Sequence, residues 1–173
     1  MYTYGRVKHK VFISYYHLDD QPYKNYIDLN LSQNIINKSV RFGEYDSENS
    51  DEYIKRLIRE DKISDSSVVI VLVGSNTKKR KHVDWEIYAA LRPSINGNAG
   101  LIGIFLPGLK SDFEKYCCLP ERLADNVKSE YATLYDWGYA ISHFDEIIEK
   151  AYNDRITKRS SIDNTRIQKK YNG

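Results

Sequence analysis

The sequence predicts an α/β protein whose mainly parallel sheet has about five strands, with helices covering both of its faces. Three observations support this prediction. Strand-like apolar runs alternate with amphipathic, helix-like runs along the chain. In the run SVVIVLVG, Ser67 to Gly74, a strand would have apolar side chains on both of its faces, as a central parallel strand does. The length of 173 residues fits one domain with a sizeable core.

The first strand and helix come early in the chain. KVFIS, Lys10 to Ser14, is rich in β-branched and aromatic residues, which favour a strand. The following DDQPYKNYIDLNLSQ predicts a helix, since its apolar residues have helical spacing: Tyr23, Tyr26, Ile27 and Leu31.

A second strand and helix follow. SVRFGEYD, Ser39 to Asp46, alternates weakly between apolar and polar residues and predicts the strand. In NSDEYIKRLIRED, Asn49 and Glu52 have the spacing of a capping box at a helix start. The apolar stripe of this helix consists of Ile54, Leu57 and Ile58.

The third helix is HVDWEIYAAL, His82 to Leu91, after the central strand, and LIGIFLP, Leu101 to Pro107, is the fourth strand. Beyond Pro107 the pattern predicts a short helix at Phe113 to Cys118 and a fifth strand in YATLYDW, Tyr131 to Trp137. A final helix begins near Ser142, where SHFD resembles a capping box, and buries Phe144, Ile147, Ile148 and Ala151. We therefore expect a domain over residues 1–157 and a polar, basic tail over 158–173 that is frayed.

Composition excludes several classes of protein. Hydrophobic residues at 41% and charged residues at 29% are typical of a globular chain. A net charge of +2 is too small to indicate a nucleic-acid partner. The two cysteines, Cys117 and Cys118, are adjacent, which favours a reducing compartment over a disulfide framework. The longest apolar run is too short to span a membrane and no signal peptide is visible, so we expect a cytoplasmic protein with no membrane partner.

About five alternating strands and helices favour the flavodoxin-like order 2-1-3-4-5, with three layers. In such sheets ligands bind beyond the carboxyl ends of the strands, where the winding reverses between strands 1 and 3. Two loops lie there: SYYHLDD after the first strand and GSNTKKRKHVDWE after the third.

Familiar catalytic motifs are missing from the sequence. It contains no GxxxxGK phosphate loop, no HExxH and no GxSxG. The glycines at 97, 100 and 103 precede a strand, so they suit turns and packing rather than a dinucleotide fingerprint. The four histidines lack metal-ligand spacing, and we expect no metal. The third strand ends in Val73, Gly74 and Ser75, without the aspartate that a phosphotransfer receiver domain would need there.

Glu86 is the residue in the third helix that most needs interpretation. Helical phase places it at the border of the apolar face formed by Val83, Ile87, Ala90 and Leu91, beside small alanines that leave space for a ligand. A glutamate in a first helical turn is also favoured by the helix dipole alone. The run Lys78 to Lys81 could attract a phosphate group or be a solvated loop. Trp85 lies opposite the apolar stripe, where it could cover a loop or an assembly contact. From the residues alone these alternatives stay open.

Three segments resemble the TIR-like family, and in particular the TIR-like sensor subunit of the bacterial Thoeris antiphage system. They are KVFISYYHLDD, SDEYIKRLIREDKISDSSVVIVLVGSNT and HVDWEIYAAL, within Lys10 to Phe105. The resemblance implies a flavodoxin-like fold and cleavage of NAD at the nicotinamide glycosidic bond, with NAD as substrate and no other cofactor. It also implies an ADP-ribose-derived, cyclic messenger that diffuses to a separate effector. Self-association on activation and a phage-derived trigger are expected in such a system.

The resemblance assigns the catalytic role to Glu86. The residues expected to bind the substrate are Phe12, Ser14, Tyr15, Tyr16, Asp46, Gly74, Ser75 and His82. For Phe12, packing of the strand is a comparable alternative to substrate binding. For Asp46, a role in a turn is a comparable alternative. His82 stands where relatives often have tryptophan, and a histidine can stack, donate a hydrogen bond or become charged.

Two other functions fit the sequence. A non-catalytic TIR-like scaffold would use the exposed face of the third helix, including Trp85 and Tyr88, for self-association. A nucleotide-binding regulator would bind NAD or cyclic nucleotides without turnover.

Overall fold

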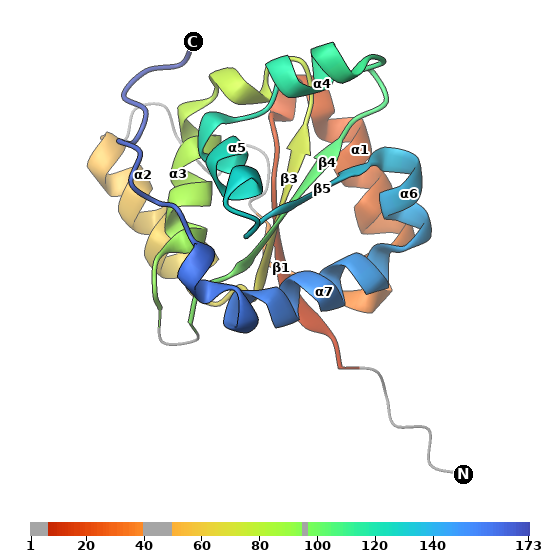
Figure 1. Ribbon diagram of the computed structural model, residues 1–173, viewed down its shortest axis with the longest axis horizontal. Helices are drawn as coiled ribbons and strands as arrows, with labels where there is room; N and C mark the ends of the chain where they lie inside the picture. The colour runs from red at the N-terminus through yellow and green to blue at the C-terminus, as the bar shows by residue number, and fades with distance from the viewer. Residues whose placement is uncertain (1–6, 40–49, 95–96) are drawn as a thin grey trace.

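A computed structural model describes residues 7–39, 50–94 and 97–173 and contains one five-stranded sheet (Figure 1). The strand order is β2-β1-β3-β4-β5, and every neighbouring pair is parallel. The strands are β1 (His9–Ser14), β2 (Ile35–Asn37), β3 (Val68–Val73), β4 (Gly100–Phe105) and β5 (Thr133–Asp136). The predicted flavodoxin-like fold is confirmed.

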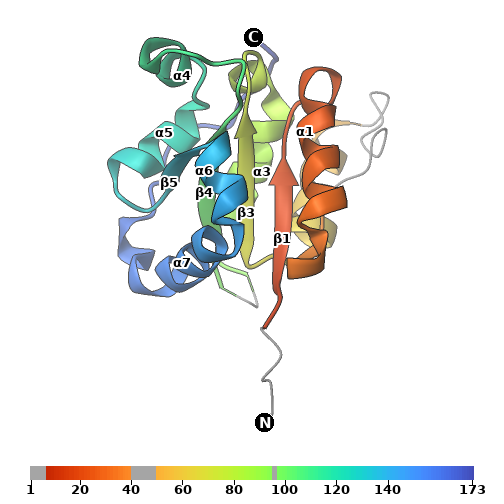
Figure 2. The same ribbon diagram turned by 90° about the vertical axis from the view of Figure 1, so that its right-hand side faces the viewer.

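Helices cover both faces of the sheet (Figure 2). One apolar cluster joins the sheet to α1 (His17–Asn30), α6 (Trp137–Ser142) and α7 (Phe144–Thr157). The other joins it to α2 (Asp51–Leu57), α3 (Lys81–Leu91) and α5 (Glu121–Lys128). A short α4 (Asp112–Cys117) follows β4, and a π-helical turn, Ile58–Ile63, extends α2. The sheet and two helical layers therefore form the three expected layers.

The central strands owe their position to their sequence. All six residues of β3, VVIVLV, are buried because helices pack on both faces of the sheet. Gly100 lets β4 approach α7, since a Cβ atom there would lie 2.2 Å from the Ala151 carbonyl oxygen. Gly103 similarly leaves room for Leu123 and Leu134. The packing role expected of these two glycines is confirmed.

Two local predictions were wrong, and a third cannot be compared. The strand predicted at 39–46 lies, apart from Ser39, outside the described part of the chain, and the strand β2 lies before it at Ile35–Asn37. The N-cap of α2 is Ser50, whose hydroxyl accepts the Tyr53 N–H. The SHFD stretch is no capping box, because the Ser142 hydroxyl donates within α6 to the Gly138 carbonyl oxygen and α7 begins at Phe144.

The C-terminal segment is also unlike the prediction. Residues 158–173 do not fray: they run across α5 and the outer face of α3 and make hydrogen bonds with both (Figure 1). A polar composition predicted fraying because it offers little surface for an apolar core. The segment is held by polar contacts instead.

Candidate active site

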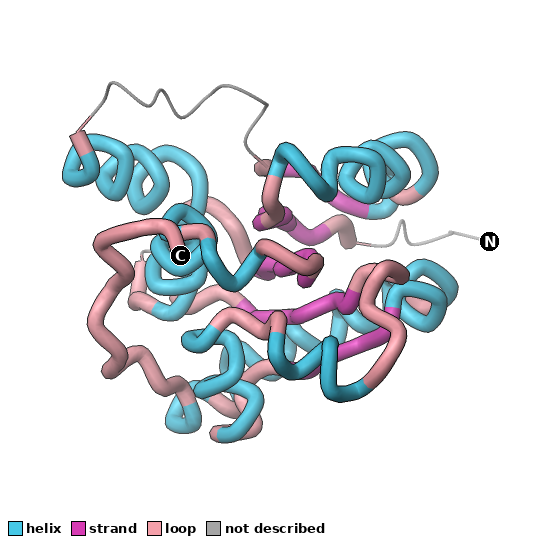
Figure 3. Tube along the Cα trace, turned by 90° about the horizontal axis from the view of Figure 1, so that it is seen from above, coloured by secondary structure: helices cyan, strands magenta, loops and turns pink. Residues whose placement is uncertain are grey.

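The candidate site lies at the carboxyl ends of β1 and β3, which are neighbours in the sheet although β2 lies between them in the sequence (Figure 2). Figure 3 shows the strands between the two helical layers. Val11 to Ser14 pair with Val68 to Val71. The chain leaves β1 toward α1 and β2, and leaves β3 toward α3 and β4 on the other side. This reversal of winding is where open α/β sheets bind ligands.

Alternation along β1 separates its side chains between the two layers. Phe12 belongs to the cluster beneath α2 and α3, where it is almost fully buried among aliphatic side chains. This is the packing role weighed against substrate binding for Phe12. Ser14 lies two residues further, nearer the carboxyl end of β1, and its buried hydroxyl makes no hydrogen bond with the described part of the chain. Ser14 is therefore a buried polar group at the carboxyl end of β1.

Aromatic residues continue from the end of β1. The Tyr15 hydroxyl donates to Gln21 Oε1 at 2.9 Å, and its ring meets His17 edge-on at 4.4 Å. Burial raises the pKa of Tyr15, with smaller contributions from the charges of Asp28 and Glu86. The Arg80 guanidinium lies 4.4 Å from the centre of the Tyr16 ring. Tyr16 thus links the β1 loop to the basic loop after β3.

The turn after β3 is built around a buried carboxyl group. The Gly74 N–H donates to Thr77 Oγ1 at 2.8 Å, and this hydroxyl lies 3.4 Å from Asp20 Oδ2. A Cβ atom on Gly74 would lie 2.6 Å from Asp20 Oδ1, so a larger residue at this position would require the Asp20 side chain to shift. Burial raises the pKa of Asp20 to about 6, and the neighbouring Asp19 adds to the rise.

His82 lies in the first turn of α3. Burial, with smaller contributions from the charges of Lys81 and Arg80, lowers its pKa to about 4. This lowered pKa favours the neutral imidazole at neutral pH. Its ring lies 5.2 Å from the ring of Trp85. A neutral imidazole can donate or accept one hydrogen bond without adding charge to the site.

Glu86 is one turn further along α3 and is only 5% exposed. It is more buried than a border position implied. Its charge contributes to the raised pKa of Tyr15, so the carboxyl group is electrostatically coupled to the loop after β1. Such a carboxylate, in a partly desolvated site, is suited to stabilise a nearby cationic centre.

The basic run after the turn does not act as one surface. Lys81 forms an ion pair with Asp51 at 2.8 Å, and Arg80 lies on Tyr16. Lys79 Nζ donates to Asn76 Oδ1 at 3.1 Å. Ser75 is exposed at the turn. The run is thus partly tied to the fold, and it borders the candidate site through Arg80.

The sequence interpretation assigned no role to two neighbours of the site, His17 and Asp20. Burial lowers the pKa of His17, and Asp20 is the carboxyl group beside Gly74. Their signal was the HLDD stretch directly after the first strand. Asp46 lies outside the described residues. Within those residues, no group of three or more histidine, cysteine, aspartate or glutamate side chains could hold a metal ion.

The fold and this site define a flavodoxin-like α/β protein with a buried carboxylate on the helix after the central strand. A family model described as "Thoeris protein ThsB, TIR-like domain" matches residues 12–111, and the chain belongs to this family. The TIR domains in a structure of the activated Roq1 resistosome directly recognizing the pathogen effector XopQ are similar at 14% identity, with a TM-score of 0.41. That similarity covers 96% of this chain and 92% of the other. Comparison with curated proteins gives no match.

Proposed function

We propose that the protein is an NAD-consuming signalling enzyme that cleaves the bond between nicotinamide and ribose. One observation carries the proposal: Glu86 is buried on α3, next to the switch point of the sheet. Its negative charge contributes to the raised pKa of Tyr15 at the end of β1. Membership of the Thoeris TIR-like family supports the same reaction.

The chemistry requires an anion more than an acid. Nicotinamide leaves a cationic glycoside as a neutral molecule, so its departure needs little proton transfer. Positive charge then develops on the ribose, and a nearby carboxylate stabilises this oxocarbenium-like centre. Glu86 has this role in the proposal and also orients the ribose hydroxyl groups.

Other residues around Glu86 bind the parts of the NAD substrate. The backbone N–H groups of the exposed turn at Ser75, with Arg80 beside them, hold the pyrophosphate. Tyr15 and Tyr16 offer aromatic surface to a base or to the nicotinamide ring. Ser14 presents its buried hydroxyl to the substrate, and His82 remains neutral, so it does not compete with the ribose cation for Glu86.

The product in this proposal is an ADP-ribose derivative, cyclised to a messenger that activates a separate antiphage effector. The enzyme stays inactive until a phage-derived trigger or self-association activates it. Within the described residues, no helix is both long and apolar enough to cross a bilayer.

The test is NAD turnover by wild type and Glu86→Gln in lysate from phage-infected cells, with products identified by mass spectrometry. We expect wild type to release nicotinamide, and Glu86→Gln to lose about 100-fold or more of this activity. Glu146→Gln is the matched control, because Glu146 is an exposed glutamate in the first turn of α7. Equal turnover by wild type and Glu86→Gln would remove Glu86 from the mechanism. No turnover by wild type in any activating lysate would favour a non-catalytic scaffold.

A further inference from the structure

The start of α3 lacks a cap of its own. Its N-cap residue is Arg80, and no side chain of the preceding loop caps it. The first N–H groups of a helix have no partner within the helix, and an uncapped first turn opens readily. His82 is in this turn and Glu86 is one turn further on. The position of both depends on whatever holds the start of α3.

A distant part of the chain supplies the missing cap. Asn172 Oδ1 accepts the Lys81 N–H at 2.9 Å, and the Gly173 N–H donates to the Lys79 carbonyl oxygen at 2.8 Å. We name residues 163–173 the strap, because this segment runs antiparallel to α3 along its outer face. Asn164 donates to the Tyr88 carbonyl oxygen, and the contacts then proceed to Asp84, Trp85, Lys81 and Lys79.

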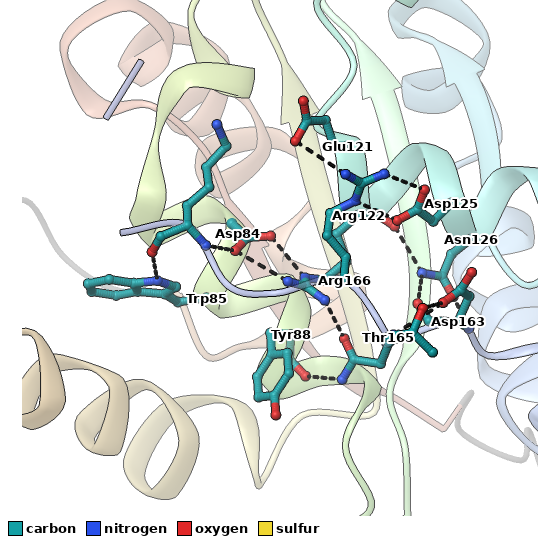
Figure 4. Close-up of polar contacts among 12 residues, drawn as sticks. Asp84, Trp85, Tyr88, Glu121, Arg122, Asp125, Asn126, Asp163, Thr165 and Arg166 are labelled. Atoms are coloured by element: carbon teal, nitrogen blue, oxygen red, sulfur yellow. Dashed lines mark hydrogen bonds and ion pairs between the residues drawn. The ribbon is translucent and has the colours of Figure 1, made fainter. Parts of the chain in front are cut away.

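The middle of the strap is fixed by the two residues that directly precede Glu86 in the sequence. The Lys169 N–H donates to Asp84 Oδ2 at 2.8 Å, and the Lys169 carbonyl oxygen accepts the indole N–H of Trp85 at 2.8 Å. Figure 4 shows Asp84 and Trp85 directed toward this segment. Trp85 is 1% exposed. The strap therefore covers the surface through which Trp85 could have made a self-association contact.

The base of the strap is anchored in α5. The guanidinium of Arg122 donates to Asp84 at 2.9 Å and to Asn164 Oδ1 at 2.9 Å, and this side chain is fully buried (Figure 4). Asn126, also fully buried, donates to the Asp163 carbonyl oxygen and accepts the Asp163 N–H. A cavity of about 150 Å³ remains between α2, α3 and Gln168. The strap is therefore attached to α3 and α5 rather than packed tightly on α2.

We infer that the strap is a positioning element for the active site, with Asn172 as a positioning residue that holds the first turn of α3. The inference rests on the proposed function of Glu86. The strap makes hydrogen bonds with Lys81, Asp84, Trp85 and Tyr88 of α3, so it supports the helix that carries Glu86. Losing the Asn172 contact frees the first turn and misplaces His82 and Glu86 relative to the substrate.

The test compares Asn172→Ala with Asn172→Asp, which keeps an acceptor oxygen. For Asn172→Ala we expect kcat for NAD cleavage to fall about ten- to a hundredfold with little change in KM, since small misplacements reduce the chemical step. Asn172→Asp should restore kcat. Lys170→Ala, at an exposed strap position, is the matched control and should behave as wild type.

A second readout does not need activity. Hydrogen exchange of the Lys81 and His82 amides should accelerate about fivefold in Asn172→Ala, the factor that corresponds to one helix cap. The two tryptophans are Trp85 and Trp137, so in a Trp137→Phe background the fluorescence of Trp85 reports on strap contact. Unchanged exchange and unchanged kcat in Asn172→Ala would overturn the inference, as would a rise in kcat. Faster exchange without NAD turnover in any variant, wild type included, would overturn the proposed function instead.

Discussion

At the scale of single residues, the pKa values of two buried groups beside the candidate site are shifted in opposite directions. The pKa of Asp20 is raised to about 6 and that of His82 is lowered to about 4, in both cases mainly by burial. Burial disfavours the charged form, which is the anion for aspartate and the cation for histidine. At neutral pH, folding therefore has to keep an ionised Asp20 within the turn that Gly74 and Thr77 form.

This arrangement predicts how Asp20 affects stability. A raised pKa means that the folded protein binds the proton more tightly than the unfolded chain does. The stabilisation is complete below about pH 4 and is lost as pH rises through about 6. Asp20→Asn should remove this loss. Between pH 4 and 7 its free energy of unfolding should change by about 1 to 3 kcal/mol less than that of wild type. Urea unfolding at several pH values measures it, with Asp112→Asn on α4 as an exposed control.

At the scale of elements, β4 and α7 approach so closely that one methyl group matters. A Cβ atom on Gly100 would overlap the Ala151 carbonyl group, which is backbone and cannot rotate away. Gly100→Ala should destabilise the fold by about 1 to 3 kcal/mol or more. Gly108→Ala is the matched control, because nothing lies within 4 Å of its added Cβ atom. Similar thermal unfolding of the two variants would contradict the packing.

The contact between α3 and α5 depends on a buried ion pair. Arg122→Ala leaves the buried Asp84 carboxylate without its guanidinium, and we expect a loss of about 3 to 5 kcal/mol in unfolding free energy. Adding Asp84→Asn to an Arg122→Met variant should recover much of that loss. Arg166→Ala, which breaks the exposed pair with Asp125, should cost less than about 1 kcal/mol. Equal losses for the two single alanine variants would show that burial does not decide the outcome.

The sequence predicted elements where apolar residues carry the pattern. β1, β3, β4 and the buried face of α7 agree with the prediction because their core residues are aliphatic or aromatic. α5 escaped notice because its buried positions include Arg122 and Asn126, which a hydrophobic pattern does not recognise. β2 was not predicted, since it has three residues, of which only Ile35 is buried.

At the scale of the whole molecule, topology and resemblance located the candidate site, and helical phase placed Glu86 beside it. Helical phase alone did not reveal that Glu86 is buried or that His82 is neutral, because burial and neighbouring charges are tertiary properties. The strap was unpredictable for a related reason. Its polar residues are stabilised by partners such as Asp84 and Trp85, each more than 80 positions away in the sequence.

That separation affects the order of folding. The hydrogen bonds between the strap and α3 span 76 to 91 residues, so their formation has to close long loops, whereas β3 and α3 are separated by a short turn. We expect the sheet and α3 to assemble first and the strap to dock late. A molecule caught between these stages would have a folded sheet but a loose first turn of α3. Competence for catalysis would then lag behind formation of the fold.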